Sequence, residues 1–277
     1  MKILLTGANS YVGARLFLDL SKKFEVVGTY HENKLSEKLI HLNITDSEEI
    51  KKIIDKQKPE IIIHAASNAN ARWCEANPKL AIALNQEPTL NIVESANNIN
   101  AKVIFISSYA AAIPNNVYGK TKYQSEKYVK RTKKGFVIIR PSLLIGFSPN
   151  TINDRPFNRI LKNLDLKTEA IYDTSWKFQP SYLGHVSEVI AQVIKNNILN
   201  ETISVAVPEL KTRYDIAKDI LGTFHIEVKP IDKKDTTNVI IDDLKALQIL
   251  KLPQYSYGKI ISKIIDEIKH REFFSTI

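Results

Sequence analysis

The stretch MKILLTGANSYVGARLFLDL, residues 1–20, carries the pattern that decides the fold. A short apolar run from Ile3 to Leu5 leads into a glycine-containing turn, TGANSYVG at residues 6–13. From Tyr11 to Lys22 apolar residues then recur at intervals of three and four, which is typical of a helix with one buried face. A buried strand, a tight turn and a helix in this order predict the first unit of an open parallel sheet.

The same alternation of apolar runs and helical segments continues to about residue 145. The runs are apolar at consecutive positions, as in strands that are buried on both faces of a parallel sheet. We therefore predict an α/β fold with a Rossmann-like, doubly wound parallel sheet and helices on both faces. The expected strands are Ile3 to Leu5, Glu25 to Tyr30, Ile61 to Ala65, Lys102 to Ser107, Phe136 to Arg140 and Ile203 to Val207. The clearest helices are Tyr11 to Lys22, Ser47 to Lys56, Pro78 to Ile99, Tyr118 to Thr132 and Ser187 to Asn196.

Composition and charge narrow the class of protein. With 44% hydrophobic and 25% charged residues, the 277-residue chain has the make-up of a globular protein, and it contains no apolar run long enough to span a membrane. The single cysteine, Cys74, cannot form an internal disulfide, which favours a reducing, cytoplasmic location. The net charge of +9 is spread over lysines along the chain, so we expect a small phosphorylated ligand rather than a nucleic acid. No set of His, Asp and Glu residues has the spacing of metal ligands, and a homodimer stays an open alternative.

The turn after the first strand is where open parallel sheets bind dinucleotides. The N-terminus of the following helix offers unpaired N–H groups and a positive dipole end to a pyrophosphate. Gly7 and Gly13 keep the outer positions of a three-glycine spacing, while Ser10 takes the middle one. A serine is tolerated there if its φ is negative, and its hydroxyl can donate to a phosphate oxygen. Taken alone, this motif leaves open that Gly7 and Gly13 are ordinary turn and packing glycines.

The end of the second expected strand bears on the choice of cofactor. An acidic residue at the strand tip holds the ribose diol in NAD sites. Here the tip is Thr29-Tyr30, followed by His31, and Lys34 lies close by. The absence of a carboxylate at the tip favours NADP, and Glu32 keeps NAD open as an alternative.

A second group of residues has the spacing of a carbonyl reductase centre. Tyr118 and Lys122 lie four residues apart near the start of an expected helix and therefore share one helix face. A lysine ammonium beside a phenol stabilises the phenolate and lowers its pKa, which makes a tunable proton donor. Ser108 ends a buried strand at the carboxyl edge of the sheet, ten residues before Tyr118. A hydroxyl, a phenol and an ammonium can thus surround one carbonyl oxygen.

Taken together, the motifs resemble the extended short-chain dehydrogenases/reductases over about the first 145 residues. Those motifs are TGANSYVG (6–13), HAAS (64–67), Asn85, ISS (106–108), YGKTK (118–122) and RPSLLIG (140–146). Within that superfamily the chain most resembles the dTDP-4-dehydrorhamnose reductase family. That likeness rests on IIIHAASNANARWCEANPKLAIALN (61–85) and DTSWKFQPSYLGHVSEVI (173–190).

The resemblance implies a role for each matching residue. Tyr118 would donate the proton to the carbonyl oxygen, and Ser108 would orient the carbonyl. Lys122 would adjust the pKa of Tyr118 and bind the ribose. The implied cofactor contacts are Gly7, Ser10, Tyr11, Val12 and Gly13 at the pyrophosphate, Tyr30 and His31 at the 2′ position, Asn43 and Ile44 at the adenine, Ala65, Ala66 and Ser67 at the ribose, Asn85 close to them, and Pro141, Ser142 and Leu144 at the nicotinamide.

The implied function is an NAD(P)H-dependent reductase of a nucleotide-linked 4-keto sugar. Two alternatives stay open: a non-catalytic, NADP-binding regulatory subunit and a nucleotide-sugar epimerase. The stretch between Ser108 and Tyr118 is shorter than is usual in this family, and residues 237–240 lack the expected Arg-Pro, so the substrate contacts are not carried over. Trp73 and Trp176 are expected near the substrate cleft.

We expect two lobes. Residues 1–146 and 182–207 are expected to form the dinucleotide-binding Rossmann domain, because the strand and helix alternation falls there. Residues 147–181 and 208–277 are expected to form a smaller substrate lobe at the carboxyl edge of the sheet.

Overall fold

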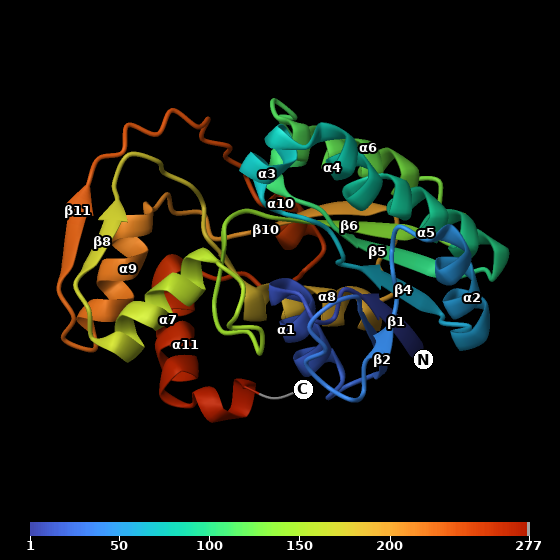
Figure 1. Ribbon diagram of the computed structural model, residues 1–277, viewed down its shortest axis with the longest axis horizontal. Helices are drawn as coiled ribbons and strands as arrows, with labels where there is room; N and C mark the ends of the chain where they lie inside the picture. Colours follow the sequence, from blue (N-terminus) through green and yellow to red (C-terminus); the bar gives the residue numbers. More distant parts are fainter. Residues whose placement is uncertain (276–277) are drawn as a thin grey trace.

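The computed structural model describes residues 1–275, and in this part of the chain seven strands form one large sheet. The strands are β1 (Lys2–Thr6), β2 (Glu25–Tyr30), β3 (Ile40–His41), β4 (Ile61–His64), β5 (Lys102–Ile106), β6 (Phe136–Pro141) and β10 (Glu201–Val205). All neighbours pair in parallel, in the spatial order β10-β6-β5-β4-β1-β2-β3 (Figure 1). The order reverses between β1 and β4, and ligands of open α/β sheets bind at such a switch point. The predicted doubly wound sheet is confirmed.

Helices cover both faces of this sheet (Figure 1). One face carries α2 (Ser47–Gln57), the short α3 (Ala71–Ala76), α4 (Pro78–Asn85), α5 (Glu87–Asn98) and α6 (Val117–Val129). The other face carries α1 (Tyr11–Leu20), α8 (Leu183–Lys195) and α10 (Lys245–Ile249). In β1, Ile3 and Leu5 join the core beneath α1 and α8, whereas Leu4 joins the core beneath α2 and α5. Side chains alternate between the two faces of a strand, so a strand with two covered faces must be apolar throughout.

Most element boundaries lie within three residues of the sequence-based expectation, whereas α8 begins at Leu183, four residues before the expected Ser187. The expected helix Pro78 to Ile99 is two helices, α4 and α5, with a break at Gln86. Pro88 explains the break, because proline lacks an N–H and fits only the first turn of a helix. β10 begins and ends two residues before the expected strand Ile203 to Val207.

A smaller group of elements packs beside the carboxyl edge of the sheet, on the left of Figure 1. It contains α7 (Pro156–Leu166), α9 (Arg213–Gly222), α11 (Tyr257–Lys269) and the parallel pair β8 (Ala170–Asp173) and β11 (Val228–Ile231). The shorter elements are β7 (Leu144–Ile145), which pairs with β9 (Ser181–Tyr182), and the 3-10 turns η1 (Tyr109–Ala111) and η2 (Arg271–Phe274).

The division of the chain into two lobes stays a prediction. Helices α7, α9 and α11 share an apolar core of their own, which includes Phe157, Ile220 and Ile264. In contrast, Leu247 and Leu252, which lie in the segment expected to belong to the smaller lobe, pack in the core of the large sheet.

Helix α1 is tied to segments far along the chain. The Tyr11 hydroxyl donates to the Gly146 carbonyl at 2.6 Å, and the Ser148 hydroxyl donates to the Tyr11 carbonyl at 2.7 Å. The Arg15 guanidinium, 4% exposed, donates to Glu267 of α11 at 2.5 Å and to the Phe147 carbonyl at 2.8 Å. The start of the first helix therefore depends on contacts with residues 146–148 and with α11.

Among residues 1–275, none of the helices combines the length and apolar composition needed to cross a membrane. Over the same residues, no group of three or more His, Cys, Asp or Glu side chains is placed to hold a metal ion.

Candidate active site

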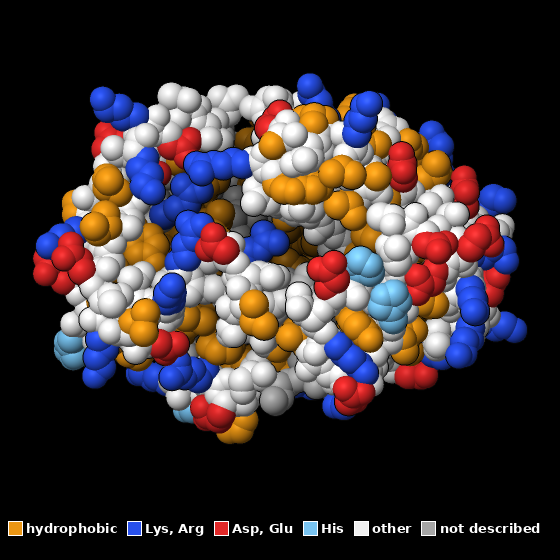
Figure 2. Space-filling model, in the orientation of Figure 1, with side chains coloured by type: hydrophobic (Ala, Val, Ile, Leu, Met, Phe, Trp, Pro, Cys, Tyr) orange, Lys and Arg blue, Asp and Glu red, His pale blue; other side chains and the backbone are white. Residues whose placement is uncertain are grey.

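A pocket of about 340 Å³ opens beyond the carboxyl ends of β1, β4, β5 and β6. Figure 2 shows a hollow near the centre of this face, with Lys and Arg side chains gathered on one of its rims. The pocket brings together many of the residues that the sequence singled out. They are Ser10, Tyr11, Val12, Ala65, Ser67, Ser108, Tyr118, Lys122, Pro141, Ser142 and Leu144.

The two glycines of the first loop are required by the backbone around them. Gly7 has a φ of +71°, and a Cβ built on it would lie 2.8 Å from the Ala66 Cα. A Cβ on Gly13 would lie 2.0 Å from the Gly7 carbonyl oxygen. Neither glycine is among the residues that line the pocket. Both therefore serve the tight turn and the close packing of loop, helix and strand.

Ser10, Tyr11 and Val12 form the part of the loop that faces the pocket. Ser10 has a φ of −76°, as expected for a serine at this position, and its hydroxyl oxygen accepts the Gly13 N–H at 3.0 Å as the N-cap of α1. The hydroxyl hydrogen remains available to donate. The first N–H groups of an α-helix have no partner inside the helix, so this turn can bind an anion. The buried Tyr11 ring points elsewhere, because its hydroxyl is used on Gly146.

The residues expected at the adenine and the 2′ position lie side by side beyond β2 and β3. The Leu42 N–H donates to the Tyr30 carbonyl at 2.8 Å, which brings the ends of the two strands together. The Tyr30 and His31 rings each lie 5.6 Å from the His41 ring. His41 is a residue that the sequence gave no reason to select, because β3 is only two residues long.

Asn43 and Ile44 follow β3 at the same edge. The Asn43 side-chain oxygen accepts both the N–H and the hydroxyl of Thr45, at 3.0 and 2.8 Å, while Ile44 packs against the core beneath α2. Tyr30, His31, Asn43 and Ile44 are not among the residues that line the pocket.

The residues of HAAS (64–67), at the end of β4, have different surroundings. Ala65 and Ser67 line the pocket, whereas Ala66 packs against Gly7. Asn85, expected near the cofactor, is 1% exposed and does not line the pocket. Its side chain bonds both backbone groups of Asn68, at 2.7 and 2.9 Å. Asn85 therefore fixes the path of the chain after Ser67.

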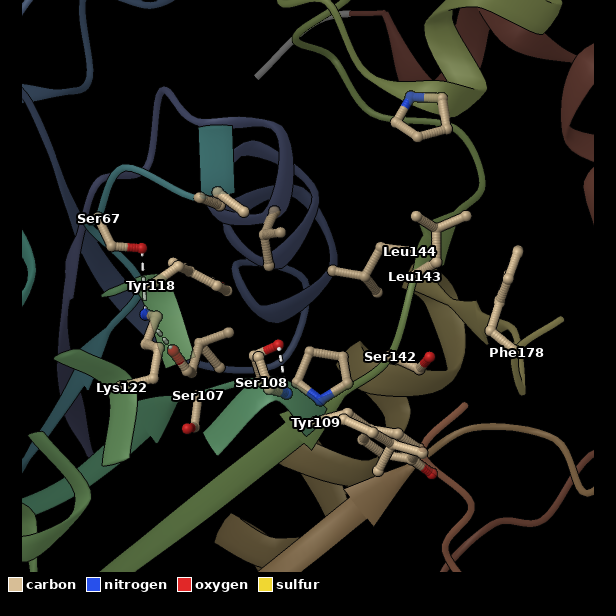
Figure 3. A pocket seen from close by; sticks show the side chains of 18 of the residues that line it. Ser67, Ser107, Ser108, Tyr109, Tyr118, Lys122, Ser142, Leu143, Leu144 and Phe178 are labelled. Carbon is tan, nitrogen blue, oxygen red and sulfur yellow. Dashed lines mark hydrogen bonds between the residues drawn. The ribbon is translucent and has the colours of Figure 1, made fainter. Parts of the chain in front are cut away.

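Ser108, Tyr118 and Lys122 meet at one end of the pocket (Figure 3). Ser108 caps η1, where its hydroxyl oxygen accepts the Ala110 N–H at 3.2 Å. Lys122 is 2% exposed, and its ammonium donates to the Ile106 carbonyl at 2.9 Å and to the Ser67 hydroxyl at 3.1 Å. The spacing of Tyr118 and Lys122 on α6 thus places a phenol and an ammonium in the same pocket, as the sequence predicted.

Burial dominates the electrostatics of this group. It raises the pKa of Tyr118 to about 12, and the side chain of Ser108 opposes the rise. The expected lowering of this pKa is therefore wrong for the protein without ligands, because desolvation of the phenolate outweighs nearby positive charge. Burial lowers the pKa of Lys122 to about 7, and the charge of Glu126 opposes the fall. At neutral pH the phenol carries its proton and can donate it.

The pocket also contains residues to which the sequence assigned no role. They are Tyr109, Asn115, Asn116, Arg155, Pro156, Phe178, Thr237, Asn238 and Ile240. Asn115 and Asn116 belong to the short stretch before Tyr118, so this stretch forms part of the wall. Residues 237–240 line the pocket although they lack the expected Arg-Pro. No local pattern marks these positions, because chain segments distant in sequence bring them together.

The two tryptophans have different surroundings. Trp176 lines the pocket, packs on Phe178 with ring centroids 4.7 Å apart, and has the Arg213 guanidinium 4.9 Å from its ring centroid. Arg213 is held in turn by Asp173 at 3.6 Å. Trp73 is not among the lining residues.

The fold and the site define a class of protein. A doubly wound parallel sheet with a phosphate loop after β1, and with Ser, Tyr and Lys side chains beyond β5, is an extended short-chain dehydrogenase/reductase. The chain belongs to the RmlD substrate binding domain family, whose sequence profile matches residues 1–240. The family resemblance predicted from the motifs is confirmed at this level.

Proteins similar to this chain include two relatives and one solved structure. Methionine adenosyltransferase 2 subunit beta from Xenopus tropicalis is 23% identical over 244 residues, which cover 81% of this chain and 72% of that protein. The dTDP-4-dehydrorhamnose reductase from Aggregatibacter actinomycetemcomitans is 25% identical over 223 residues, which cover 74% and 71%. The crystal structure of dTDP-4-dehydrorhamnose reductase from Bacillus anthracis in complex with NADP has the same fold. Its TM-score is 0.82 at 20% identity, and the match covers 96% of this chain and 99% of that chain.

Proposed function

We propose that this chain is an NAD(P)H-dependent reductase of a nucleotide-linked 4-keto sugar, with NADP(H) as its cofactor. One observation carries the proposal: Ser108, Tyr118 and Lys122 line the same pocket as the phosphate loop from Ser10 to Val12. A dinucleotide that lies on this loop can reach the phenol within one continuous pocket.

The protein groups around the pocket fit such a cofactor. Ser10 lines the pocket at the start of α1, so its hydroxyl and the first N–H groups of the helix can donate to a pyrophosphate. Outside the pocket, beyond β2 and β3, His31 lies beside His41. The Lys34 ammonium, which pairs with Glu37 at 2.5 Å, lies 5.8 Å from the centroid of the Tyr30 ring. These groups suit a 2′-phosphate, which supports NADP over NAD. When bound, the reduced cofactor would supply the hydride for the carbonyl carbon.

The proposed chemistry at the carbonyl oxygen uses three side chains. Ser108 and Tyr118 hydrogen-bond the oxygen and so fix the ketone. As negative charge develops on the oxygen, the Tyr118 hydroxyl transfers its proton to it, and the alcohol and a phenolate result. Lys122, one helical turn away, stabilises that phenolate through its positive charge.

The size of the pocket and the position of Arg155 in its lining support a nucleotide sugar as the substrate. The pocket of about 340 Å³ lies within the size range of sites for small ligands. Arg155 lines it, and its charge lowers the pKa of Tyr118, so it acts on the reducing centre from the opposite wall. A guanidinium there can pair with a diphosphate while the sugar ring reaches Tyr118.

Replacing Tyr118 by Phe tests the chemistry. Y118F removes the proton donor and should lower kcat at least about a hundredfold, with little change in NADPH affinity. The control is Y123F on the same helix, since Tyr123 is 41% exposed and outside the pocket. Turnover is followed as NADPH oxidation in a screen of nucleotide 4-keto sugars. Equal rates for Y118F and wild type would rule out this mechanism.

The likeness to a protein named as a subunit beta favours a second candidate, a non-catalytic, NADP-binding regulatory subunit. Calorimetric titration with NADPH, followed by the same substrate screen, separates the two. NADPH binding without turnover of any nucleotide sugar, together with a stable complex with another protein, would support the regulatory subunit. An epimerase would instead retain NAD through purification and prefer it to NADP.

A further inference from the structure

A buried carboxylate lies one helical turn beyond Lys122. Glu126 is 2% exposed and follows Tyr118 and Lys122 along α6 at intervals of four, so the three side chains share one face of the helix. One Glu126 oxygen accepts the Ser107 hydroxyl at 2.6 Å and the Arg140 Nε–H at 2.8 Å. The other accepts the Arg140 Nη2–H at 2.5 Å. These donors hold the carboxylate in place.

The groups in direct contact with the Lys122 ammonium are uncharged. Its ammonium lies 4.7 Å from the centroid of the Phe105 ring and donates to the Ile106 carbonyl and the Ser67 hydroxyl. Burial disfavours the ammonium and lowers the pKa of Lys122 to about 7, close to the pH at which a cell works. A small change in the surroundings of Lys122 therefore has a large effect on the fraction of molecules in which it is protonated.

Four titratable groups surround Lys122: Glu126 and Tyr118 on α6, Cys74 on α3 and His64 on β4. Glu126 and Cys74 act on the Lys122 charge, and the cation Arg140 of β6 is bonded to Glu126. The pKa of Tyr118 is raised to about 12, and burial also raises the pKa of the Cys74 thiol, so both are uncharged at neutral pH. The pKa of His64 is lowered to about 3, so this ring is uncharged as well. Of the four, Glu126 is the anion.

We propose that Glu126 is a positioning residue of the reducing centre, which keeps Lys122 in its ammonium form. Arg140 and Ser107 hold the Glu126 carboxylate in place, and the carboxylate acts on Tyr118 only through Lys122. The effect of Glu126 on turnover rests on the proposed reductase function. The effect on Lys122 itself is a property of the protein without substrate.

The titration of Lys122 tests this directly. Protein labelled with ¹³C at the lysine Cε is titrated by NMR, and the Lys122 signal is identified by its loss in K122R. E126Q should move the midpoint of Lys122 to lower pH by about one unit, whereas E126D, which keeps the charge, should restore most of it. The matched control is E267Q, because Glu267 is 4% exposed and also pairs with an arginine, but on α11. E267Q should leave the midpoint unchanged.

A double variant guards against loss of folding. E126Q alone leaves Arg140 without its partner, whereas E126Q/R140M removes both charges of the pair and is the milder change. The midpoint should fall in this variant too. An unchanged midpoint in folded E126Q or E126Q/R140M, judged by circular dichroism, overturns the proposal.

The pH dependence of turnover separates this proposal from the reductase function. With any nucleotide sugar that the wild type reduces, the alkaline fall in kcat should move to lower pH in E126Q by the same amount as the Lys122 midpoint. A shifted midpoint in a protein that reduces no nucleotide sugar would refute the proposed function and leave the role of Glu126 standing. Turnover of a nucleotide sugar together with an unshifted Lys122 midpoint would support the proposed function and refute the role of Glu126.

Discussion

At the residue scale, Gly7 has little freedom to change in the loop after β1. Its φ of +71° and the 2.8 Å distance from a built Cβ to the Ala66 Cα both oppose a side chain. At Gly258, in the first turn of α11, nothing lies within 4 Å of such a Cβ.

Replacing these two glycines by alanine should therefore have opposite effects. G7A should lower the free energy of unfolding by about 1–3 kcal/mol and weaken NADPH binding, because the loop must move away from Ala66. G258A should leave the free energy of unfolding unchanged or raise it by up to about 1 kcal/mol. Urea unfolding and fluorescence titration with NADPH measure both quantities. Equal stability of the two variants would contradict the packing described for Gly7.

Single residues also mark what the sequence could predict. The negative φ of Ser10 follows from serine at the middle position of the loop, and the structure confirms it. Asn85 is expected beside the cofactor, and in the structure its side chain holds the backbone of Asn68. An asparagine can bond either a ligand or a neighbouring loop. The choice depends on the path of that loop, which the local sequence does not reveal.

At the element scale, the buried pair between Arg15 of α1 and Glu267 of α11 links two helices that are far apart in sequence. Replacing Glu267 leaves Arg15 with Asp19 as its remaining carboxylate partner and takes a charged acceptor from the Phe147 N–H. E267Q should lower the free energy of unfolding by about 1–3 kcal/mol. In contrast, the Arg159–Asp154 pair is 63% and 73% exposed, and D154N should cost less than about 1 kcal/mol. Urea unfolding at neutral pH measures both changes in the free energy of unfolding. Similar losses in the two variants would contradict a larger stabilising effect of the buried pair.

Elements with a clear pattern could be placed from the sequence, and others could not. β2 coincides with the expected strand Glu25 to Tyr30, because the apolar run has charged or polar neighbours at both ends. The break at Gln86 was missed, since the apolar spacing continues through it while Pro88 interrupts the hydrogen bonds. β3 was missed because two residues show no periodicity.

At the scale of the whole molecule, His64 should make stability depend on acidity. It is buried against Phe105, its Nε2 has no hydrogen-bond partner, and burial lowers its pKa to about 3 from an ordinary value of 6.5. Between these two values the unfolded chain binds a proton that the folded protein does not, so stability falls as the pH falls.

Wild type should therefore lose about 2 kcal/mol more than H64F between pH 7 and pH 5. H270F, at an exposed position on the surface, should behave like wild type. Urea unfolding at the two pH values gives the comparison. An equal loss in H64F and wild type would mean that carboxylates alone set the acid sensitivity.

Arg155 and residues 237–240 line the pocket but could not be assigned to it from the sequence. The switch point of the sheet, the phosphate loop and the Ser108, Tyr118 and Lys122 group follow from local spacing and from the rule that strand ends meet at one edge. Arg155 and residues 237–240 reach the pocket only because the smaller group of elements packs back against that edge. Such long-range contacts leave no periodic mark in the chain.

The Arg15–Glu267 pair also has a consequence for how the protein is made. A ribosome synthesises Arg15 252 residues before Glu267, whereas Asp19, its other carboxylate partner, lies four residues away on the same helix. Throughout that interval Asp19 can pair with the Arg15 cation, and Glu267 joins the pair only when α11 has emerged. The loop that leads into α1 is thus translated long before the last contact that fixes this helix.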